Sequence, residues 1–145
     1  MSSAAGLGFT LDTMTTLTAM ITKGVFDDIP DLHVVTGHFG EALPFLLTRM
    51  DHFLTQEREA ELKNTHDFSY YFKNNIWVTT SGNMQTSAFE LTKDMLGIDR
   101  ILLATDYPYE SLQEEMDFLN GLDLTDEERE KLYHGNAEAL MGIGE

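Results

Sequence analysis

The sequence predicts an α/β fold in which parallel strands are covered by outer helices. Three short apolar stretches, residues 32–36, 76–79 and 101–104, have the character of strands, and each is followed by a segment with helical spacing. Strand–helix alternation is typical of parallel sheets. The stretch "RILLAT" at residues 100–105 is almost continuously apolar, as expected for a strand buried on both faces. We therefore expect successive βα units in a single domain over residues 1–145.

One helix is expected before the first strand and one after every strand. Thr125, with Glu128 three residues later, has the pattern of a capping box, and Asn136 is a candidate N-cap for a last short helix. Helical spacing predicts a core-facing stripe in each longer helix. The predicted stripes are Leu11, Met14, Leu17, Met20 and Ile21 in residues 10–23; Ala42, Phe45, Leu46, Met50 and Phe53 after the first strand; Ala88, Leu91 and Met95 after the second; and Leu112, Met116 and Leu119 after the third.

Composition excludes several classes of protein. The 145 residues are enough for one domain with a sizeable core, and the absence of cysteine excludes disulfides and thiolate metal sites. Asp and Glu total 25 against 9 Lys and Arg, a formal net charge of −16 that would repel nucleic acid and anionic membranes. No secretory leader and no long apolar run are seen, so a cytoplasmic location is expected.

Polar side chains follow each predicted strand directly. His38 comes after the first strand, Thr80 and Ser81 after the second, and Asp106 after the third. The carboxyl ends of parallel strands meet at one edge of the sheet, where α/β enzymes carry their chemistry. We therefore expect His38, Ser81 and Asp106 to lie close together, with Ser81 lining the pocket because it lacks the G-x-S-x-G context of a serine nucleophile.

Two interpretations of Asp106 are compatible with its position. Its carboxylate is suited to bind a metal or to carry a proton, and it is equally suited to cap the following helix. His38 lies between Gly37 and Gly40, which permit close approach of backbone or ligand. Glu41 can accept a hydrogen bond from one imidazole nitrogen and leave the other for substrate, water or metal.

The remaining candidate residues are interpreted more simply. His33 lies at a strand start, away from the expected site, and His52, His66 and His134 are expected at surface or packing positions. Arg49, on the helix after His38, is interpreted on its spacing alone as a surface ion pair with Asp51 or Glu41.

Four separated motifs resemble one known family. They are "GVFDDIPDLHVVTGHFGEALPFLLTRMDHF" (24–53), "NNIWVTTSGN" (74–83), "RILLATDYPYE" (100–110) and "GNAEALMGI" (135–143). Together they resemble the metal-dependent decarboxylase branch of the amidohydrolase superfamily, which includes γ-resorcylate, dihydroxybenzoate and aminocarboxymuconate semialdehyde decarboxylases. The resemblance extends from about Leu7 to Ile143, which is nearly the whole chain.

The resemblance implies a (β/α)8 barrel whose strands six, seven and eight end at His38, Ser81 and Asp106. It implies that Asp106 binds a divalent metal (Zn, Mn or Mg) and takes part in proton transfer. It also implies that His38 is an acid–base residue with Glu41 as its partner. Arg49 is implied as a contact to the substrate carboxylate, in some relatives within a neighbouring subunit's site. A small carboxylic acid is the implied substrate.

One departure from the family is large. Relatives carry further metal ligands on strand one and a histidine on strand five, and this sequence has no counterpart to either. We therefore expect the C-terminal portion of a barrel, truncated at its N-terminus, that forms a homo-oligomer or depends on the missing barrel half. The leading hypothesis is a non-oxidative decarboxylase of an aromatic or unsaturated acid. The alternatives are a metal-dependent hydrolase on the same scaffold and an inactive remnant or interaction module.

Overall fold

The computed structural model describes residues 4–57 and 62–143. Within these ranges the strands form one parallel sheet in the order β1 (Val34–Thr36), β2 (Ile76–Thr79) and β3 (Ile101–Leu102). Val35 pairs with Trp77, and Val78 pairs with Ile101. The predicted α/β class and parallel order are confirmed, and β2 has the predicted bounds. β1 and β3 are shorter than the predicted residues 32–36 and 101–104.

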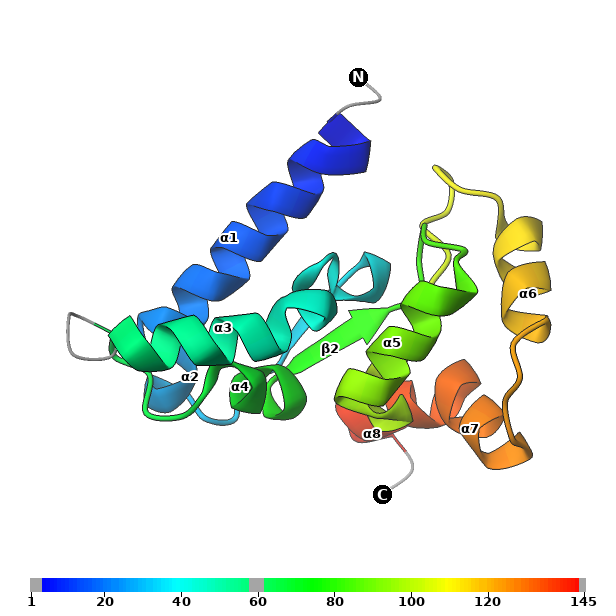
Figure 1. Cartoon of the computed structure of the whole chain (residues 1–145). Helices are drawn as coiled ribbons and strands as arrows, with labels where there is room; N and C mark the ends of the chain where they lie inside the picture. The colour runs from blue at the N-terminus through cyan, green and yellow to red at the C-terminus, as the bar shows by residue number, and fades with distance from the viewer. Residues whose placement is uncertain (1–3, 58–61, 144–145) are drawn as a thin grey trace.

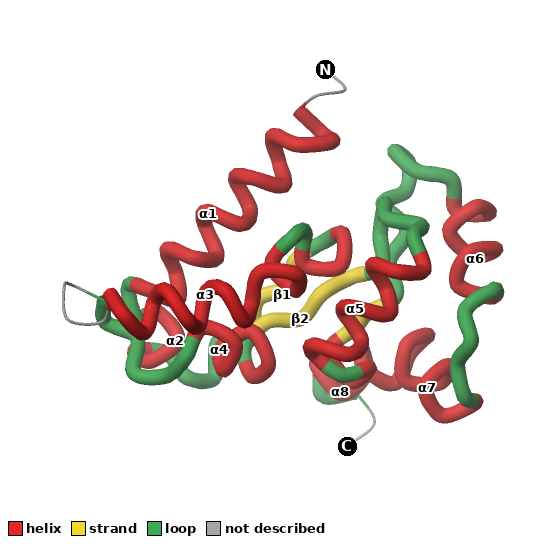
Figure 2. The backbone as a smooth tube through the Cα atoms, in the orientation of Figure 1, coloured by secondary structure: helices red, strands yellow, loops and turns green. Residues whose placement is uncertain are grey.

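Helices precede the sheet and follow each strand, as the alternation predicts (Figures 1 and 2). The α-helices are α1 (Phe9–Thr22), α2 (Val25–Asp28), α3 (Leu43–Glu57), α4 (Phe68–Asn74), α5 (Thr86–Leu96), α6 (Leu112–Asn120), α7 (Asp126–Glu130) and α8 (Asn136–Met141). Shorter helical turns are η1 (Ala4–Gly8), η2 (His38–Gly40), η3 (Ile98–Arg100) and η4 (Lys131–Gly135). Figure 1 shows α1 projecting away from the sheet toward the N-terminus. No helix in the described ranges has the length and apolar character needed to cross a membrane.

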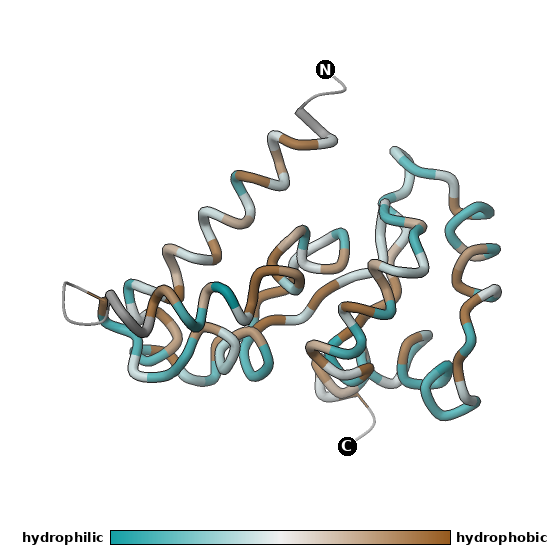
Figure 3. The backbone as a smooth tube through the Cα atoms, viewed as in Figure 1, coloured by the Kyte–Doolittle hydropathy of each residue, from teal (hydrophilic) through white to brown (hydrophobic). Residues whose placement is uncertain are grey.

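One face of the sheet packs against the helices. Ile76, Val78 and Ile101 point into this core and have no solvent exposure. Figure 3 shows the strands as mainly apolar stretches, whereas α6 and α7 carry many polar positions. The fully buried side chains that the helices and turns add to the core are Ile21, Phe39, Leu43, Leu47, Phe68, Phe72, Phe89, Leu119 and Leu132. Removing this apolar surface from water is the main stabilising contribution to the fold.

The opposite face of the sheet is only partly covered. Val35 is 49% exposed, whereas Val34 and Thr36, on either side of it in the strand, are partly buried and buried. The ring of Trp77 is covered by the guanidinium of Arg100, 4.7 Å from the ring centroid, and by the edge of His33. The predicted burial of the sheet on both faces therefore holds at Trp77 but not at Val35.

The predicted core face of α3 is confirmed at Met50, which packs against the core, and wrong at Phe45 and Phe53. Phe45 and Phe53 are 74% and 42% exposed, and Leu43 and Leu47 are buried instead. Every residue from 42 to 47 is apolar, so spacing alone fits more than one face of this helix. The sheet selects the face that carries Leu43 and Leu47, which pack with the core.

Similar shifts occur in three other helices. The predicted core residues Leu11, Leu91 and Leu112 are exposed, whereas Leu17, Ile21 and Leu119 are buried as predicted. In α5 the buried positions are Phe89, Thr92 and Leu96. Leu11 and Leu112 lie near the starts of their helices, and the other predicted positions of α1 and α6 are buried or pack against the core.

The two capping predictions have opposite outcomes. Thr125 and Glu128 form the reciprocal capping box at the start of α7. Asn136 is not an N-cap, because it has helical backbone angles within the last turns. Its side-chain amide is buried and donates to the carbonyl oxygens of Ile98 and Ile101, each at 2.7 Å. Asn136 thus ties the C-terminal helix to the start of β3.

Candidate active site

The structure brings together the polar residues predicted at the strand ends. Nδ1 of His38 lies 2.7 Å from the main-chain carbonyl oxygen of Ser81. An ideal Cβ placed on Gly82 would lie 2.9 Å from His38 Nδ1 and 3.8 Å from Asp106 Oδ2. His38 and Asp106 therefore both lie close to Gly82, at the carboxyl edge of the sheet.

The backbone around His38 forms an unusual left-handed turn. His38, Phe39, Gly40 and Glu41 all have positive φ values, between 53° and 74°. Non-glycine residues adopt this conformation at a cost of about 1–2 kcal/mol each, and such strain is concentrated at functional sites. The turn is closed by hydrogen bonds from Gly40 N to Gly37 O and from Glu41 N to His38 O.

Burial of Phe39 holds this turn in place. Its ring is 1% exposed and packs edge-on against Phe89, with the ring centroids 5.9 Å apart. Gly40 has no room for a side chain, because a Cβ would lie 3.0 Å from Val78 and 3.3 Å from Phe72. The prediction that Gly37 and Gly40 make room at the site is therefore wrong for Gly40, whose free space is taken by the core.

Gly82 is the glycine that makes room between the two candidate catalytic groups. It has a φ of +66°, and any side chain on it would collide with the imidazole of His38. Gly82 was not among the predicted site residues. Its signal was the "SGN" that follows β2, a turn composition in which glycine takes the left-handed conformation.

The contact with Ser81 fixes the chemistry of His38. A carbonyl oxygen can only accept a hydrogen bond, so Nδ1 of His38 is the donor. The neutral ring therefore presents Nε2 as its unprotonated nitrogen. The side-chain hydroxyl of Ser81 is elsewhere, 2.8 Å from Oγ1 of Thr79. Ser81 thus contributes its carbonyl to His38.

Asp106 is exposed and is not the cap of the following helix. Ser111 caps α6 and accepts a hydrogen bond from Glu114 N. Within the described residues the Asp106 carboxylate makes no hydrogen bond or ion pair, while its main-chain carbonyl accepts from Tyr109 N and Glu110 N. Asp106 also has a positive φ of 56°. Of the two interpretations of Asp106, the structure removes helix capping and leaves the carboxylate open to a ligand.

The predicted hydrogen bond between Glu41 and His38 is not formed. Oε2 of Glu41 instead accepts from the hydroxyl of Thr10 at 2.7 Å, a contact between the η2 turn and α1. The Ser81 carbonyl takes the place predicted for Glu41, because it accepts the hydrogen bond from one imidazole nitrogen, Nδ1. The role of Glu41 in the site stays a prediction.

Arg49 lies apart from the strand ends. Its exposed guanidinium stacks on Phe53, one turn along α3, 4.6 Å from the ring centroid. The structure therefore does not bring Arg49 into the His38 cluster, and the predicted substrate contact stays a prediction. No ion pair of Arg49 with Asp51 or Glu41 occurs among the salt bridges of the described residues.

A buried carboxyl group lies behind the site. Glu115, on α6, has no solvent exposure, and neither of its side-chain oxygens has a hydrogen-bond partner. Burial raises the pKa of Glu115 above its ordinary value. Glu115 was not among the predicted site residues, although its position four residues before the buried Leu119 places both on one face of the helix.

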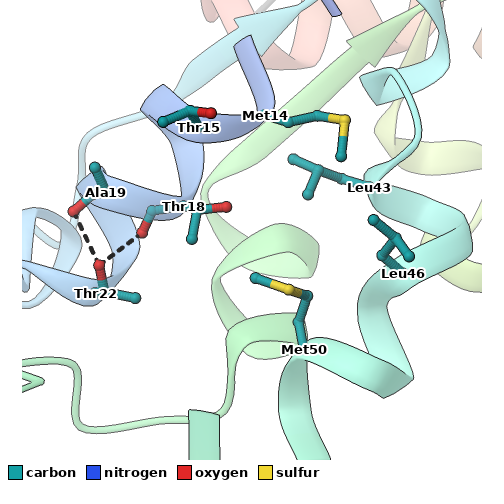
Figure 4. A pocket seen from close by; sticks show the side chains of 8 residues that line it. All are labelled: Met14, Thr15, Thr18, Ala19, Thr22, Leu43, Leu46 and Met50. Atoms are coloured by element: carbon teal, nitrogen blue, oxygen red, sulfur yellow. Dashed lines mark hydrogen bonds between the residues drawn. The ribbon is translucent and has the colours of Figure 1, made fainter. Parts of the chain in front are cut away.

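A cavity of about 420 Å3 between α1 and α3 is separate from the strand-end cluster (Figure 4). Thr22 Oγ1 donates to the carbonyl of Thr18 at 2.9 Å, within the helix that forms one wall. The described side chains that line the cavity carry no ionisable group, so they offer no acid–base or metal chemistry. They are Met14, Thr15, Thr18, Ala19, Thr22, Leu43, Leu46 and Met50.

The donor set at the strand ends is too small to form a metal site by itself. A protein zinc site takes three or four ligands. Over residues 4–57 and 62–143 no group of three or more His, Asp or Glu side chains is arranged to hold a metal ion. Asp106 and His38 together offer two donors, so these residues alone do not fit a complete metal centre.

Comparisons with known proteins identify relatives of this fold and site. The family model described as "Amidohydrolase" matches residues 3–143. The γ-resorcylate decarboxylase of Polaromonas sp. (strain JS666) is 34% identical over 127 residues, which cover 83% of this chain and 37% of that protein.

Solved structures agree with this match. The crystal structure of 5-carboxyvanillate decarboxylase from Sphingomonas paucimobilis superposes with a TM-score of 0.89 at 31% identity, covering 94% of this chain and 41% of the other. A dihydroxybenzoic acid decarboxylase from Polaromonas sp. JS666, with bound manganese and the inhibitor 2-nitroresorcinol, has a TM-score of 0.88 at 30% identity, covering 94% and 42%. The chain thus spans less than half the length of these relatives.

Proposed function

Because the chain belongs to the amidohydrolase family, we propose that it forms part of a metal-dependent, non-oxidative decarboxylase of aromatic carboxylic acids. The relatives described above are decarboxylases of hydroxylated benzoic acids. The observation that supports the proposal most strongly is that the His38 imidazole and the Asp106 carboxylate both lie next to Gly82.

The segment corresponds, in this proposal, to the last three βα units of a (β/α)8 barrel. β1, β2 and β3 would then be strands six, seven and eight, and residues 1–145 would belong to one larger barrel domain. The parallel order of the strands, the helices on one face and the half-exposed Val35 on the other support this assignment. In a closed barrel, residues on the face of Val35 would be covered by the remaining strands.

His38 acts as the acid–base group through Nε2. Its Nδ1–H is held by the Ser81 carbonyl, so Nε2 is the nitrogen that takes up and delivers a proton. In decarboxylation, a proton is transferred to the ring carbon that bears the carboxylate. The bond to the carboxylate then breaks, its electron pair returns to the ring, and CO2 leaves. Asp106, beside His38, takes part in moving this proton.

Asp106 would also supply one ligand to a divalent metal, and the described residues offer no complete set of ligands for it. Such a metal supplies Lewis-acid stabilisation of negative charge on bound oxygen atoms. Manganese is present in related decarboxylase structures, and carboxylate oxygen is a suitable ligand for it. Arg49, exposed on α3, is proposed to reach the substrate carboxylate from a neighbouring subunit.

A chimaeric enzyme tests this function directly. In this chimaera the matching segment of the Polaromonas γ-resorcylate decarboxylase is replaced by the present chain, and CO2 release from 2,6-dihydroxybenzoate is measured with manganese present. We expect turnover, which Asp106→Asn abolishes together with most bound manganese. Asp99→Asn is the matched control, because Asp99 is exposed and pairs with Lys131 on the surface. Turnover that survives Asp106→Asn contradicts the proposal.

The same chimaera separates the alternatives. Hydrolysis of the corresponding esters or lactones without CO2 release favours the metal-dependent hydrolase. A folded chimaera that binds manganese and catalyses neither reaction favours the inactive remnant.

A further inference from the structure

The carboxyl group of Glu115 lies directly behind the turn that carries the site. The Thr80 hydroxyl and the Gly82 amide face this carboxyl and act to lower its pKa, against the larger opposite effect of burial. Neither makes a hydrogen bond of good geometry with it. The carboxylates of Glu110 and Asp106 add to the effect of burial. A charged carboxylate here would be buried without a counter-ion, so the neutral acid is the favoured form.

Thr80 connects this buried group to two strands. Its hydroxyl donates to Ala104 O at 2.8 Å and accepts from Ala104 N at 3.1 Å, which joins the end of β2 to the segment that leads into Asp106. On the other side of the same turn, Ser81 O contacts His38 and Gly82 separates His38 from Asp106. A change behind the turn is therefore transmitted to both candidate catalytic groups.

We propose that Glu115 is a positioning residue, whose carboxyl supports the Thr80–Gly82 turn from the core side and thereby sets the orientation of the His38 imidazole. The proposal follows from three observations: the fully buried, unpaired carboxyl of Glu115 beside Thr80 and Gly82, the Ser81 carbonyl against His38, and the absence of space at Gly82. This geometric role stands on the structure, whereas its consequence for turnover rests on the proposed decarboxylase function.

Two substitutions distinguish positioning from simple packing. Glu115→Gln keeps the size, the neutral state and one donor and one acceptor, so it should preserve the turn. Glu115→Leu introduces an apolar side chain of similar bulk and removes the carboxyl group. Glu114→Gln, on the exposed face of the same helix, is the matched control.

The readout is the tautomer of His38 in the 15N-labelled 145-residue chain, measured by long-range proton–nitrogen correlation, with His38→Asn used to assign its signals. We expect the Nδ1–H tautomer in the wild type, Glu115→Gln and Glu114→Gln. In Glu115→Leu we expect loss of this single tautomer, with the other four histidines unchanged. If Glu115→Leu does not fold by circular dichroism, Glu115→Asp, which withdraws the carboxyl by one methylene, should give the same loss.

An unchanged His38 spectrum in the folded apolar or shortened variant overturns the proposal. The proposal is also overturned if Glu115→Gln loses the tautomer as the leucine variant does, since the charged form would then be required. In the chimaeric enzyme, Glu115→Leu should lower kcat with little change in KM. An altered His38 spectrum without CO2 release in any variant contradicts the proposed function alone.

Discussion

Nδ1 of His38 lies 2.7 Å from the carbonyl oxygen of Ser81, and this contact joins the turns that follow two neighbouring strands. The imidazole is therefore oriented by the βα unit next to its own. Because the carbonyl accepts, the free ring nitrogen is Nε2. A substitution that keeps the left-handed backbone at residue 38 and removes Nε2 isolates the role of that nitrogen.

His38→Asn is such a substitution, because asparagine tolerates positive φ and its amide can still donate to Ser81 O. In the chimaeric enzyme we expect turnover to fall by about 10²–10⁴-fold, the usual contribution of a general acid–base group. Manganese content, measured by elemental analysis, should stay near that of the unsubstituted enzyme. His134→Asn is the control, since the His134 side chain is 55% exposed and pairs with Glu138 one helical turn away. A parallel loss of manganese would show that His38 is a ligand instead.

Gly82→Ala should displace the imidazole of His38, although residue 38 itself is unchanged. A methyl group at residue 82 would lie 2.9 Å from Nδ1, so the imidazole must move away from Ser81. We expect a loss of stability of about 2–3 kcal/mol, from a left-handed alanine plus the lost hydrogen bond. Turnover of the chimaera should fall as in His38→Asn.

The control for Gly82→Ala is Gly142→Ala. Gly142 has a nearly equal φ of +63°, and a Cβ there meets no atom within 4 Å. Its substitution should cost only the backbone strain, about 1–2 kcal/mol, with turnover retained. Equal effects of the two substitutions on turnover would contradict a steric role for Gly82.

The sequence predicts those features that depend on local pattern. The bounds of β2, the capping box of Thr125 and the strand-end positions of His38 and Asp106 follow from periodicity, cap chemistry and the rule that strand ends share one edge. The family resemblance then indicates which of these positions carry chemistry.

Features that depend on tertiary packing could not be predicted in this way. The exposure of Phe45 depends on which of several apolar faces the sheet accepts. Glu41 contacts Thr10, and Asn136 reaches Ile98, across 31 and 38 residues of sequence. Glu115 lies on the buried face of α6 with Leu119, but its type, a charged residue, predicts exposure.

Asn136→Ala should strongly destabilise the chain, because Asn136 is a buried polar residue. It removes two buried hydrogen bonds and leaves the carbonyl oxygens of Ile98 and Ile101 without this donor. We expect the free energy of unfolding, from urea denaturation, to fall by about 2–3 kcal/mol. Asn74→Ala, which removes one exposed hydrogen bond to Tyr70 O, is the control and should cost less than about 1 kcal/mol. Similar losses of stability in both variants would refute a stabilising role for the two hydrogen bonds of Asn136.

A second polar cluster, around Asp27, predicts how stability depends on pH. Its carboxylate accepts hydrogen bonds from the hydroxyls of Tyr71, at 2.7 Å, and Thr65. Burial acts to raise the pKa of Asp27, but these hydrogen bonds outweigh it, and the pKa is lowered below its ordinary value of 3.8. The cluster lies at the amino-terminal end of the sheet, near Pro30 and Asn75, away from His38.

Tyr71→Phe should therefore destabilise the chain most when Asp27 is ionised. Because the folded-state pKa is the lower one, the unfolded chain binds more protons near pH 4, and stability rises with pH there. The contribution of Asp27 is complete above about pH 5 and is lost as the pH falls through the folded-state pKa.

At pH 7 we expect Tyr71→Phe to lower the free energy of unfolding, from urea denaturation, by about 1–2 kcal/mol. The loss should shrink below pH 4 without vanishing, since Thr65 N and His66 N also lose Tyr71 Oη as acceptor. Tyr70→Phe, which keeps the ring stacked on His66, is the control and should show no such pH dependence. A loss that is constant from pH 3 to pH 7 would show that the hydroxyl acts through the main-chain contacts alone.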